Sequence, residues 1–221
     1  ADLARPVDDN PLLRVAPPLR HGPQSALKHV LDRTLAGLGV LVLSPLLLTI
    51  ALAIRLSSRG PVLYRHERIG QDGVPFVMWK FRTMYIGADA RKAELAQDNE
   101  LDGPVFKMRS DPRVTRFGRV LRRTSLDELP QLANVLRGEM SLVGPRPPLA
   151  DEVARYTAVE RRRLAVRPGM TGLWQISGRC ELSWDEALQL DLSYVDNWSF
   201  TSDLDVMFRT LRAVVDGRGA Y

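Results

Sequence analysis

The sequence predicts a mostly helical α+β protein, held at a membrane by one proline-broken helix and carrying a small β-hairpin. Three observations support this fold class. An uncharged run of 21 residues, 34–54, contains Ser44-Pro45 near its midpoint. Two β-prone runs, 62–68 and 74–81, flank a Gly-Gln-Asp-Gly turn. Apolar residues recur at helical spacing over much of the remaining chain.

The uncharged run would span ~30 Å of hydrocarbon as one straight helix. Pro45 lacks the N–H that a helix interior needs, and its ring collides with the carbonyl of Leu41, so we expect a sharp kink. Arg33 and Arg55 flank the run, and positive charge marks the cytoplasmic side of a membrane. This pattern favours a re-entrant helix with both ends cytoplasmic. An ordinary spanning helix with a tolerated proline and a buried core helix are the alternatives.

A chain of 221 residues is long enough for one or two domains. We divide it into a flexible proline-rich lead-in (1–26), the helix-break-helix (27–58) and a domain on the cytosolic face with amphipathic helices (59–221). The net charge of +5 suits anionic membrane lipids or phosphorylated substrates. The single cysteine, Cys180, excludes an intrachain disulfide, and no zinc-type spacing occurs.

The elements after the membrane segment follow from local patterns. Asp72-Gly73 suits the positive φ of a hairpin turn, so the two β-prone runs are expected to pair. A helix near residue 130 has Pro130 in its first turn and ends at Gly138. A mobile loop is expected at 99–103. Helices are predicted over residues 88–97, 130–136, 150–166, 184–198 and 203–215.

Asp127-Glu128 is an adjacent carboxylate pair that follows a dense basic run. Residues 107–123 hold seven lysines and arginines against one acid, Asp111. Ser125-x-x-Glu128 also matches a capping box, so the pair fits an ordinary helix start. The chemical alternative is that the arginines keep a carboxylate ionised, so that it serves as a nucleophile or metal ligand near a polyanion.

Three further basic residues, Lys80, Arg82 and Arg146, lie near turns where their side chains can converge on a phosphate. Glycine-rich phosphate loops are absent from the sequence. The combination predicts a Mg²⁺-diphosphate substrate held by side chains. No nucleic acid is expected as a partner, because few aromatic residues interleave with the basic run and no nucleic-acid-binding motif occurs.

Five motifs occur in order along the chain. They are Ser44-Pro45-Leu46-Leu47, Lys80-Phe81-Arg82-Thr83-Met84, and the runs from Arg122 to Leu132, from Ser141 to Pro147 and from Arg167 to Gln175. Together they resemble the bacterial sugar transferase family, the monotopic polyprenyl-phosphate phosphoglycosyl transferases that start exopolysaccharide, capsule and O-antigen assembly. The resemblance covers residues 26–215.

The resemblance implies transfer of a sugar-1-phosphate from a UDP-sugar to undecaprenyl phosphate at the cytoplasmic face of the bacterial inner membrane. It implies that Asp127 is the nucleophile, forming a phosphosugar–aspartate intermediate as UMP leaves. Mg²⁺ would be held by Asp127 and Glu128, with Glu128 also orienting the carboxylate. Arg122 resembles a phosphate-binding position, and Arg146 a nucleotide-diphosphate contact. Ser44-Pro45 matches the helix break of the family.

Several properties stay open at this point. The region 174–191 resembles hexose-1-phosphate transferases, with glucose as the first expectation and galactose as the second. Trp174 fits stacking on uracil or core packing. The oligomeric state is undetermined, and a homodimer is compatible with the sequence. The alternative function is a non-catalytic basic membrane adaptor, in which Asp127-Glu128 is only a helix start and Asp127→Asn is tolerated.

Overall fold

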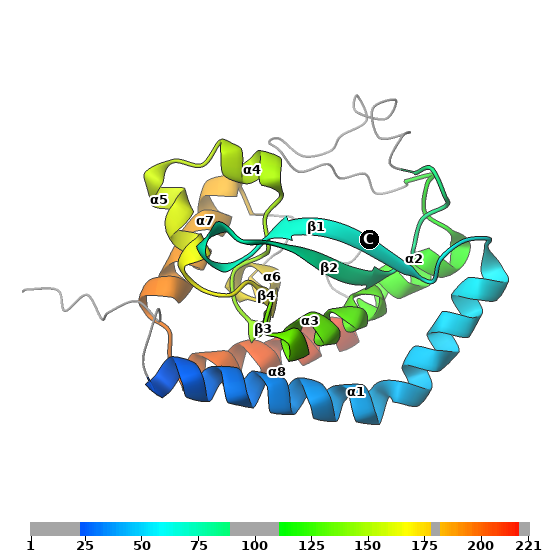
Figure 1. Ribbon diagram of the computed structural model, residues 1–221, viewed down its shortest axis with the longest axis horizontal. Helices are drawn as coiled ribbons and strands as arrows, with labels where there is room; N and C mark the ends of the chain where they lie inside the picture. Colours follow the sequence, from blue (N-terminus) through cyan, green and yellow to red (C-terminus); the bar gives the residue numbers. More distant parts are fainter. Residues whose placement is uncertain (1–22, 89–110, 178–181, 217–221) are drawn as a thin grey trace, which may run out of the picture.

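The computed structural model describes residues 23–88, 111–177 and 182–216, which form mostly helices with two small sheets (Figure 1). The predicted helix at 88–97 (apart from residue 88), the predicted loop at 99–103 and Cys180 lie outside this part of the chain. The elements are α1 (Pro23–Ser57), β1 (Leu63–Ile69), β2 (Pro75–Phe81), α2 (Arg116–Arg123), α3 (Leu132–Arg137), β3 (Ser141–Val143), α4 (Ala150–Ala154), α5 (Ala158–Arg161), β4 (Gly169–Thr171), α6 (Leu173–Ile176), α7 (Trp184–Asp196) and α8 (Phe200–Asp216). Short 3-10 segments occupy Gln71–Gly73, Leu126–Gln131 and Arg162–Ala165.

The first helix, α1, contains Pro45 and bends within its light-blue part (Figure 1). Pro45 cannot donate to the carbonyl of Leu41, and the hydroxyl of Ser44 donates to that oxygen instead, at 2.8 Å. The predicted kink is therefore present. The helix begins at Pro23, earlier than the expected boundary at residue 27, because proline is well suited to a first helical position.

Within the described residues, α1 is the helix that is long and apolar enough to cross a membrane. Only 11% of its most apolar 18-residue window is buried. Leu41 and Val42 are 70% and 73% exposed. The alternative of a buried core helix is therefore wrong, and a large apolar surface stands open to the surroundings.

The predicted hairpin is confirmed. β1 and β2 pair antiparallel, with Leu63 opposite Phe81 and Ile69 opposite Pro75. At the turn, Asp72 has a φ of 55° and Gly73 a φ of 81°, the left-handed conformations that Asp and Gly tolerate best.

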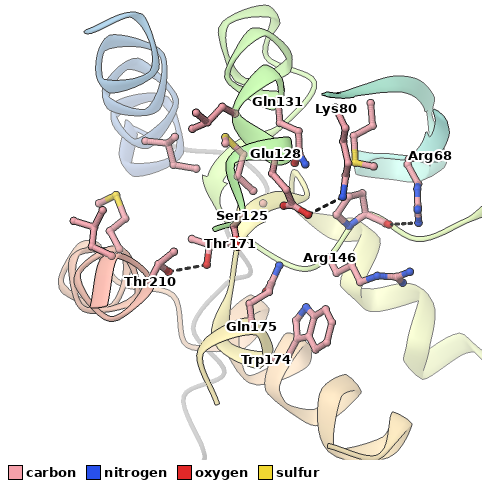
Figure 2. Close-up of a pocket in the computed structure, with 18 residues that line it drawn as sticks. Arg68, Lys80, Ser125, Glu128, Gln131, Arg146, Thr171, Trp174, Gln175 and Thr210 are labelled. Carbon is pink, nitrogen blue, oxygen red and sulfur yellow. Dashed lines mark hydrogen bonds and ion pairs between the residues drawn. The ribbon is translucent and has the colours of Figure 1, made fainter. Parts of the chain in front are cut away.

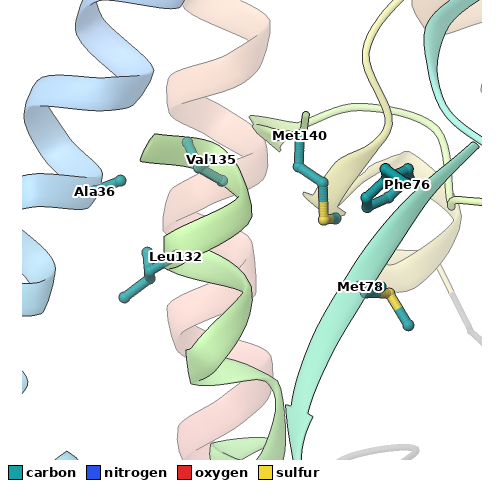
Figure 3. Packing of buried hydrophobic residues seen from close by; sticks show 6 residues of the cluster. All are labelled: Ala36, Phe76, Met78, Leu132, Val135 and Met140. Atoms are coloured by element: carbon teal, nitrogen blue, oxygen red, sulfur yellow. The ribbon is translucent and has the colours of Figure 1, made fainter. Parts of the chain in front are cut away.

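A hydrophobic core joins α1, α3 and β2 (Figure 3). Ala36 of α1 faces α3, and Phe76 and Met78 of β2 lie across α3 from it and belong to the same cluster. The core consists of Ala36, Phe76, Met78, Leu132, Val135 and Met140. This packing places the end of the hairpin beside the 3-10 segment that carries Asp127 and Glu128.

A buried amide on α3 joins that helix to β2. Asn134 is 0% exposed. Its Oδ1 accepts from the backbone N–H of Trp79 at 3.1 Å, and its Nδ2 donates to the carbonyl of Val77 at 2.7 Å. These bonds satisfy backbone groups on the edge of β2 that faces away from β1. They also fix the position of the strand relative to α3.

The second sheet is a short parallel pair, with Ser141 opposite Gly169 and Val143 opposite Thr171. The two segments approach so closely that a Cβ at Gly169 would collide with the backbone nitrogen of Gly144. Gly169 donates its N–H to the carbonyl of Pro145 at 2.9 Å. The loop that carries Arg146 is therefore held directly against the chain preceding α6.

The helix predicted over residues 150–166 is wrong as a single element, because the chain forms α4, α5 and a 3-10 segment there. A capping box starts α5. Thr157 accepts from the N–H of Glu160 at 3.3 Å, and the Glu160 carboxylate accepts from the N–H of Thr157 at 2.6 Å. This local pairing ends one helix and begins another.

The last helix, α8, is joined to α1 near the start of each helix. A buried ion pair links them, with Lys28 Nζ 2.6 Å from Asp203 Oδ2. Tyr194 of α7 donates its hydroxyl to Asp203 Oδ1 at 2.9 Å. Four large apolar side chains of α8 are exposed, namely Phe200, Leu204, Phe208 and Leu211. The predicted helices near residues 184–198 and 203–215 are confirmed with small differences in their bounds.

Candidate active site

A cavity of about 560 Å³ opens between the hairpin, the 3-10 segment Leu126–Gln131, the loop before α4, and α8 (Figure 2). Four of its described lining residues are charged, namely Arg68, Lys80, Glu128 and Arg146, and together they are called the charged wall. Six others are apolar leucine and methionine side chains, namely Met78, Leu129, Leu142, Met170, Met207 and Leu211. Neutral polar side chains also line the cavity, among them Ser125, Gln131, Thr171, Gln175 and Thr210. The cavity therefore suits a ligand with an anionic part and an apolar part.

Asp127 and Glu128 lie on the 3-10 segment, and the capping box expected there does not form. Ser125 has a φ of 55°, in the left-handed region, and makes no side-chain capping bond. A serine in this conformation is uncommon, and such positions cluster at functional sites. Glu128 instead accepts from Lys80 Nζ at 2.7 Å. The predicted capping box is therefore wrong, although both acids do lie in the first turn of a helical segment that continues into α3.

Asp127 is only 9% exposed. Burial, followed by the like charge of Glu128, raises its pKa from 3.8 to about 6, while Lys80 and Arg122 act in the opposite direction. The basic neighbours act as expected, in favour of the ionised carboxylate, but burial has the larger effect on its pKa. With a pKa of about 6, the group is still mostly ionised at neutral pH. A raised pKa of this kind is typical of functional carboxyl groups.

Three of the five predicted charged site residues in this region line the cavity, and two do not. Lys80, Glu128 and Arg146 line the cavity, whereas Asp127 and Arg122 are not among its described lining residues. Arg122 donates its Nε to Thr83 Oγ1 at 3.0 Å, and it lies near enough to Asp127 for their charges to interact.

Arg82 lies away from the described lining of the cavity. Its Nη1 donates to the carbonyl of Arg59 at 2.6 Å, and its Nη2 donates to the carbonyl of Ser58 at 2.9 Å. The side chain therefore ties the chain just after α1 to the end of β2. Substrate contact by Arg82 stays a prediction, and its visible contacts are structural.

Arg146 is held by a carboxylate that the sequence did not single out. Glu152, whose side chain is 2% exposed, accepts from Arg146 Nη1 at 3.0 Å through Oε2 and from Nη2 at 3.3 Å through Oε1. This two-point contact orients the guanidinium group at the cavity.

Arg68 and Trp174 also line the cavity. Arg68 donates Nη1 to the carbonyl of Pro147 at 3.2 Å, across 79 positions of sequence. Sequence analysis missed Arg68 because nothing in the local sequence of β1 indicates that the end of this strand contacts the loop at Pro147. Trp174 lies in the cavity lining, and its stacking on uracil stays a prediction.

The sequence pattern of the bacterial sugar transferase family matches residues 23–217 of this chain. The chain belongs to this family.

Three relatives illustrate the match. The exopolysaccharide production protein ExoY of Rhizobium meliloti (strain 1021) is 45% identical over 198 residues, covering 88% of each chain. The UDP-glucose:undecaprenyl-phosphate glucose-1-phosphate transferase of Caulobacter vibrioides is 42% identical over 220 residues, 96% of this chain and 75% of the relative. The undecaprenyl-phosphate galactose phosphotransferase of Salmonella typhimurium (strain LT2) is 39% identical over 214 residues, 95% of this chain. This chain spans 45% of the Salmonella protein, and 43% and 42% of two other relatives.

The donor set of this bacterial sugar transferase fits Mg²⁺. No group of three or more metal-binding side chains occurs in the part of the chain that the structure describes. Mg²⁺ is commonly held by one or two carboxylates together with substrate phosphates, so the pair Asp127-Glu128 is compatible with the ion, and its binding stays a prediction. The mutual repulsion that helps to raise the pKa of Asp127 is what a cation beside the pair would relieve.

Proposed function

We propose that this chain transfers a sugar-1-phosphate from a UDP-sugar to undecaprenyl phosphate, releasing UMP. The mixed lining of the cavity carries the proposal, because the reaction joins a charged nucleotide sugar to a lipid phosphate with an apolar tail. The charged wall and the leucine and methionine side chains of the lining suit these two substrates. The relatives named for transfer to undecaprenyl phosphate support the same activity.

In the proposed first step, a carboxylate oxygen of Asp127 attacks the phosphorus next to the sugar. The bond from that phosphorus to the UMP oxygen breaks, and a phosphosugar–aspartate remains on the enzyme. In the second step, an oxygen of the lipid phosphate attacks the same phosphorus and releases the aspartate, yielding a polyprenyl diphosphate sugar. Asp127 must lose its proton before the first step, and the charges of Lys80 and Arg122 favour that loss.

The basic residues carry the electrostatic part of the mechanism. Two anions approach each other in each step, so fixed positive charge must lie where negative charge develops. Arg146, oriented by Glu152, and Lys80, paired with Glu128, present such charge at the cavity. Mg²⁺ bound by Asp127 and Glu128 would neutralise phosphate charge in the same place.

The proposed location is the cytoplasmic face of the bacterial inner membrane, with α1 as a re-entrant helix. The bend in α1 and its exposed apolar surface support this placement (Figure 1). The exposed Leu204, Phe208 and Leu211 of α8, which is joined to α1 by the ion pair of Lys28 and Asp203, would add apolar contact with the lipid.

The sugar is proposed to be a hexose, with glucose before galactose. One relative is named for glucose and another for galactose, so the names alone do not separate the two. Direct comparison of UDP-glucose and UDP-galactose is therefore part of the test.

The test is intact-mass spectrometry of the purified chain in detergent with Mg²⁺ and each UDP-sugar. We expect a mass increase equal to a hexose phosphate, absent from Asp127→Asn and present in Glu67→Gln, an exposed-carboxylate control on β1. Addition of undecaprenyl phosphate should remove the adduct and produce the lipid-linked sugar. If neither sugar nucleotide gives an adduct or UMP, the proposal is wrong and the adaptor function gains support.

A further inference from the structure

Arg68 lies in the charged wall of the cavity, near Arg146 (Figure 2). Strand β1 carries Arg68 next to its end, and the hairpin register places it opposite Phe76 of β2. Its two terminal nitrogens contact the carbonyl of Pro147, at 3.2 Å, and Nδ1 of His66, at 3.3 Å. Both partners are neutral acceptors in these contacts, so they bind the guanidinium group without balancing its charge.

The charge of Arg68 has no direct counterion among the described residues. Glu152 is the carboxylate with the largest effect on the pKa of Arg68, but it pairs with Arg146. Burial lowers the pKa of Arg68 to about 10, and the like charge of Arg146 is the next cause. Its Nε is buried without a hydrogen-bond partner. The two carboxylates that act on Arg68 are each paired with another residue, Glu152 with Arg146 and Glu128 with Lys80. A partly buried guanidinium group without its own ion pair costs stability in the absence of a further anion.

We propose that Arg68 and Arg146 form an anion subsite in the cavity that binds the phosphate oxygens of a phosphorylated substrate. The subsite rests on the proposed function and adds Arg68 to its binding residues. Guanidinium groups present planar pairs of donors that match phosphate oxygens, and they stay charged at this degree of burial. The phosphate comes either from the diphosphate of the nucleotide sugar or from the lipid phosphate, and both present the same chemistry.

A purely structural role for Arg68 makes a different prediction. Its bond to Pro147 ties β1 to the loop that carries Arg146. If that tie were its only role, replacement would lower the melting temperature and leave the anion affinity of the folded protein unchanged. An anion-binding role predicts the reverse, because removing an unbalanced buried charge relieves the ligand-free protein.

The first measurement uses the full chain in detergent, comparing wild type with Arg68→Gln, in which a side-chain donor remains but the charge is lost. Arg65→Gln is the matched control, since Arg65 is exposed on the same strand. Titration calorimetry with pyrophosphate, UMP and uridine should show about 10- to 100-fold weaker binding of the two anions to Arg68→Gln, the loss of one charge-assisted contact. Uridine affinity and the melting temperature should not fall, and Arg65→Gln should match the wild type.

The second measurement identifies the source of the phosphate. A higher UDP-sugar concentration for half-maximal adduct formation assigns the subsite to the donor, whereas a higher KM for undecaprenyl phosphate alone assigns it to the acceptor. Unchanged pyrophosphate and UMP affinities in Arg68→Gln, or a lower melting temperature with unchanged KM values, overturn the subsite. Absence of an adduct in the wild type counts against the proposed function instead, and the pyrophosphate titration still decides the subsite.

Discussion

Replacement of Asp127 by asparagine should abolish the covalent adduct and, in the same molecule, stabilise the ligand-free protein above neutral pH. The substitution keeps the shape of the side chain and removes an ionisable group from a position that is 9% exposed. Burial and Glu128 both disfavour the charged form of Asp127. The residue proposed to perform the chemistry is therefore expected to cost the fold stability.

The size of the effect follows from the pKa of Asp127, which is about 6 in the folded protein and 3.8 ordinarily. The folded state binds the proton more tightly, so the carboxyl group costs nothing well below pH 3.8. The cost grows as the pH rises above 3.8 and is complete once the pH exceeds about 6. At about 1.4 kcal/mol per pKa unit, the full cost is about 3 kcal/mol, or roughly 6 to 12 °C in melting temperature.

The assay compares melting temperatures of wild type and Asp127→Asn in one detergent between pH 4 and pH 8. The gain of the variant should be small at the acid end, grow with pH and level off above pH 6 to 7. Mg²⁺ should reduce it, because a cation beside Asp127 favours the ionised form. Glu67→Gln, at an exposed position, should change little at any pH. A variant that is no more stable than the wild type at pH 8 would refute the explanation by burial.

Three other predictions concern neighbouring residues. Lys80→Met removes a charge that lowers the pKa of Asp127, so the pH of half-maximal adduct formation should move upward; an unchanged pH–rate profile would contradict this. Asn134→Leu leaves the buried N–H of Trp79 without its acceptor and should cost about 2 to 4 kcal/mol of unfolding free energy, measured as a lower melting temperature. Arg82→Met should also lower the melting temperature while leaving the KM for the UDP-sugar unchanged, whereas a raised KM at unchanged stability would make Arg82 a substrate contact.

The elements that sequence analysis predicted well are those with local causes. The turn at Asp72-Gly73 needs a positive φ, which these two residue types accept, and two β-prone runs lie beside it. Gly138 ends α3 with a φ of 78°, as expected for a helix C-terminus. Pro45 bends α1 because proline itself lacks the N–H that a helix interior needs, whatever its surroundings.

Predictions failed where a local pattern had two outcomes. Ser125 and Glu128 have the spacing of a capping box, but Lys80, 48 positions earlier, takes the Glu128 carboxylate. Residues 150–166 have helical periodicity, and the capping box at Thr157 nevertheless divides them. At Glu128 a contact from a distant part of the chain decided the outcome, and at Thr157 a local capping contact did.

The sequence by itself determined the family, the apolar helix with its break, the hairpin and the identity of the adjacent carboxylates. These follow from residue types and short spacings, because bond geometry and hydrophobic patterning act over a few residues. Only the tertiary structure decided that Lys80, Glu128 and Arg146 share one cavity, that Arg82 holds the chain after α1, and that Arg68 joins the charged wall. Burial and charge at these positions depend on elements far apart in the chain, and the same burial raises the pKa of Asp127 although basic residues surround it in sequence.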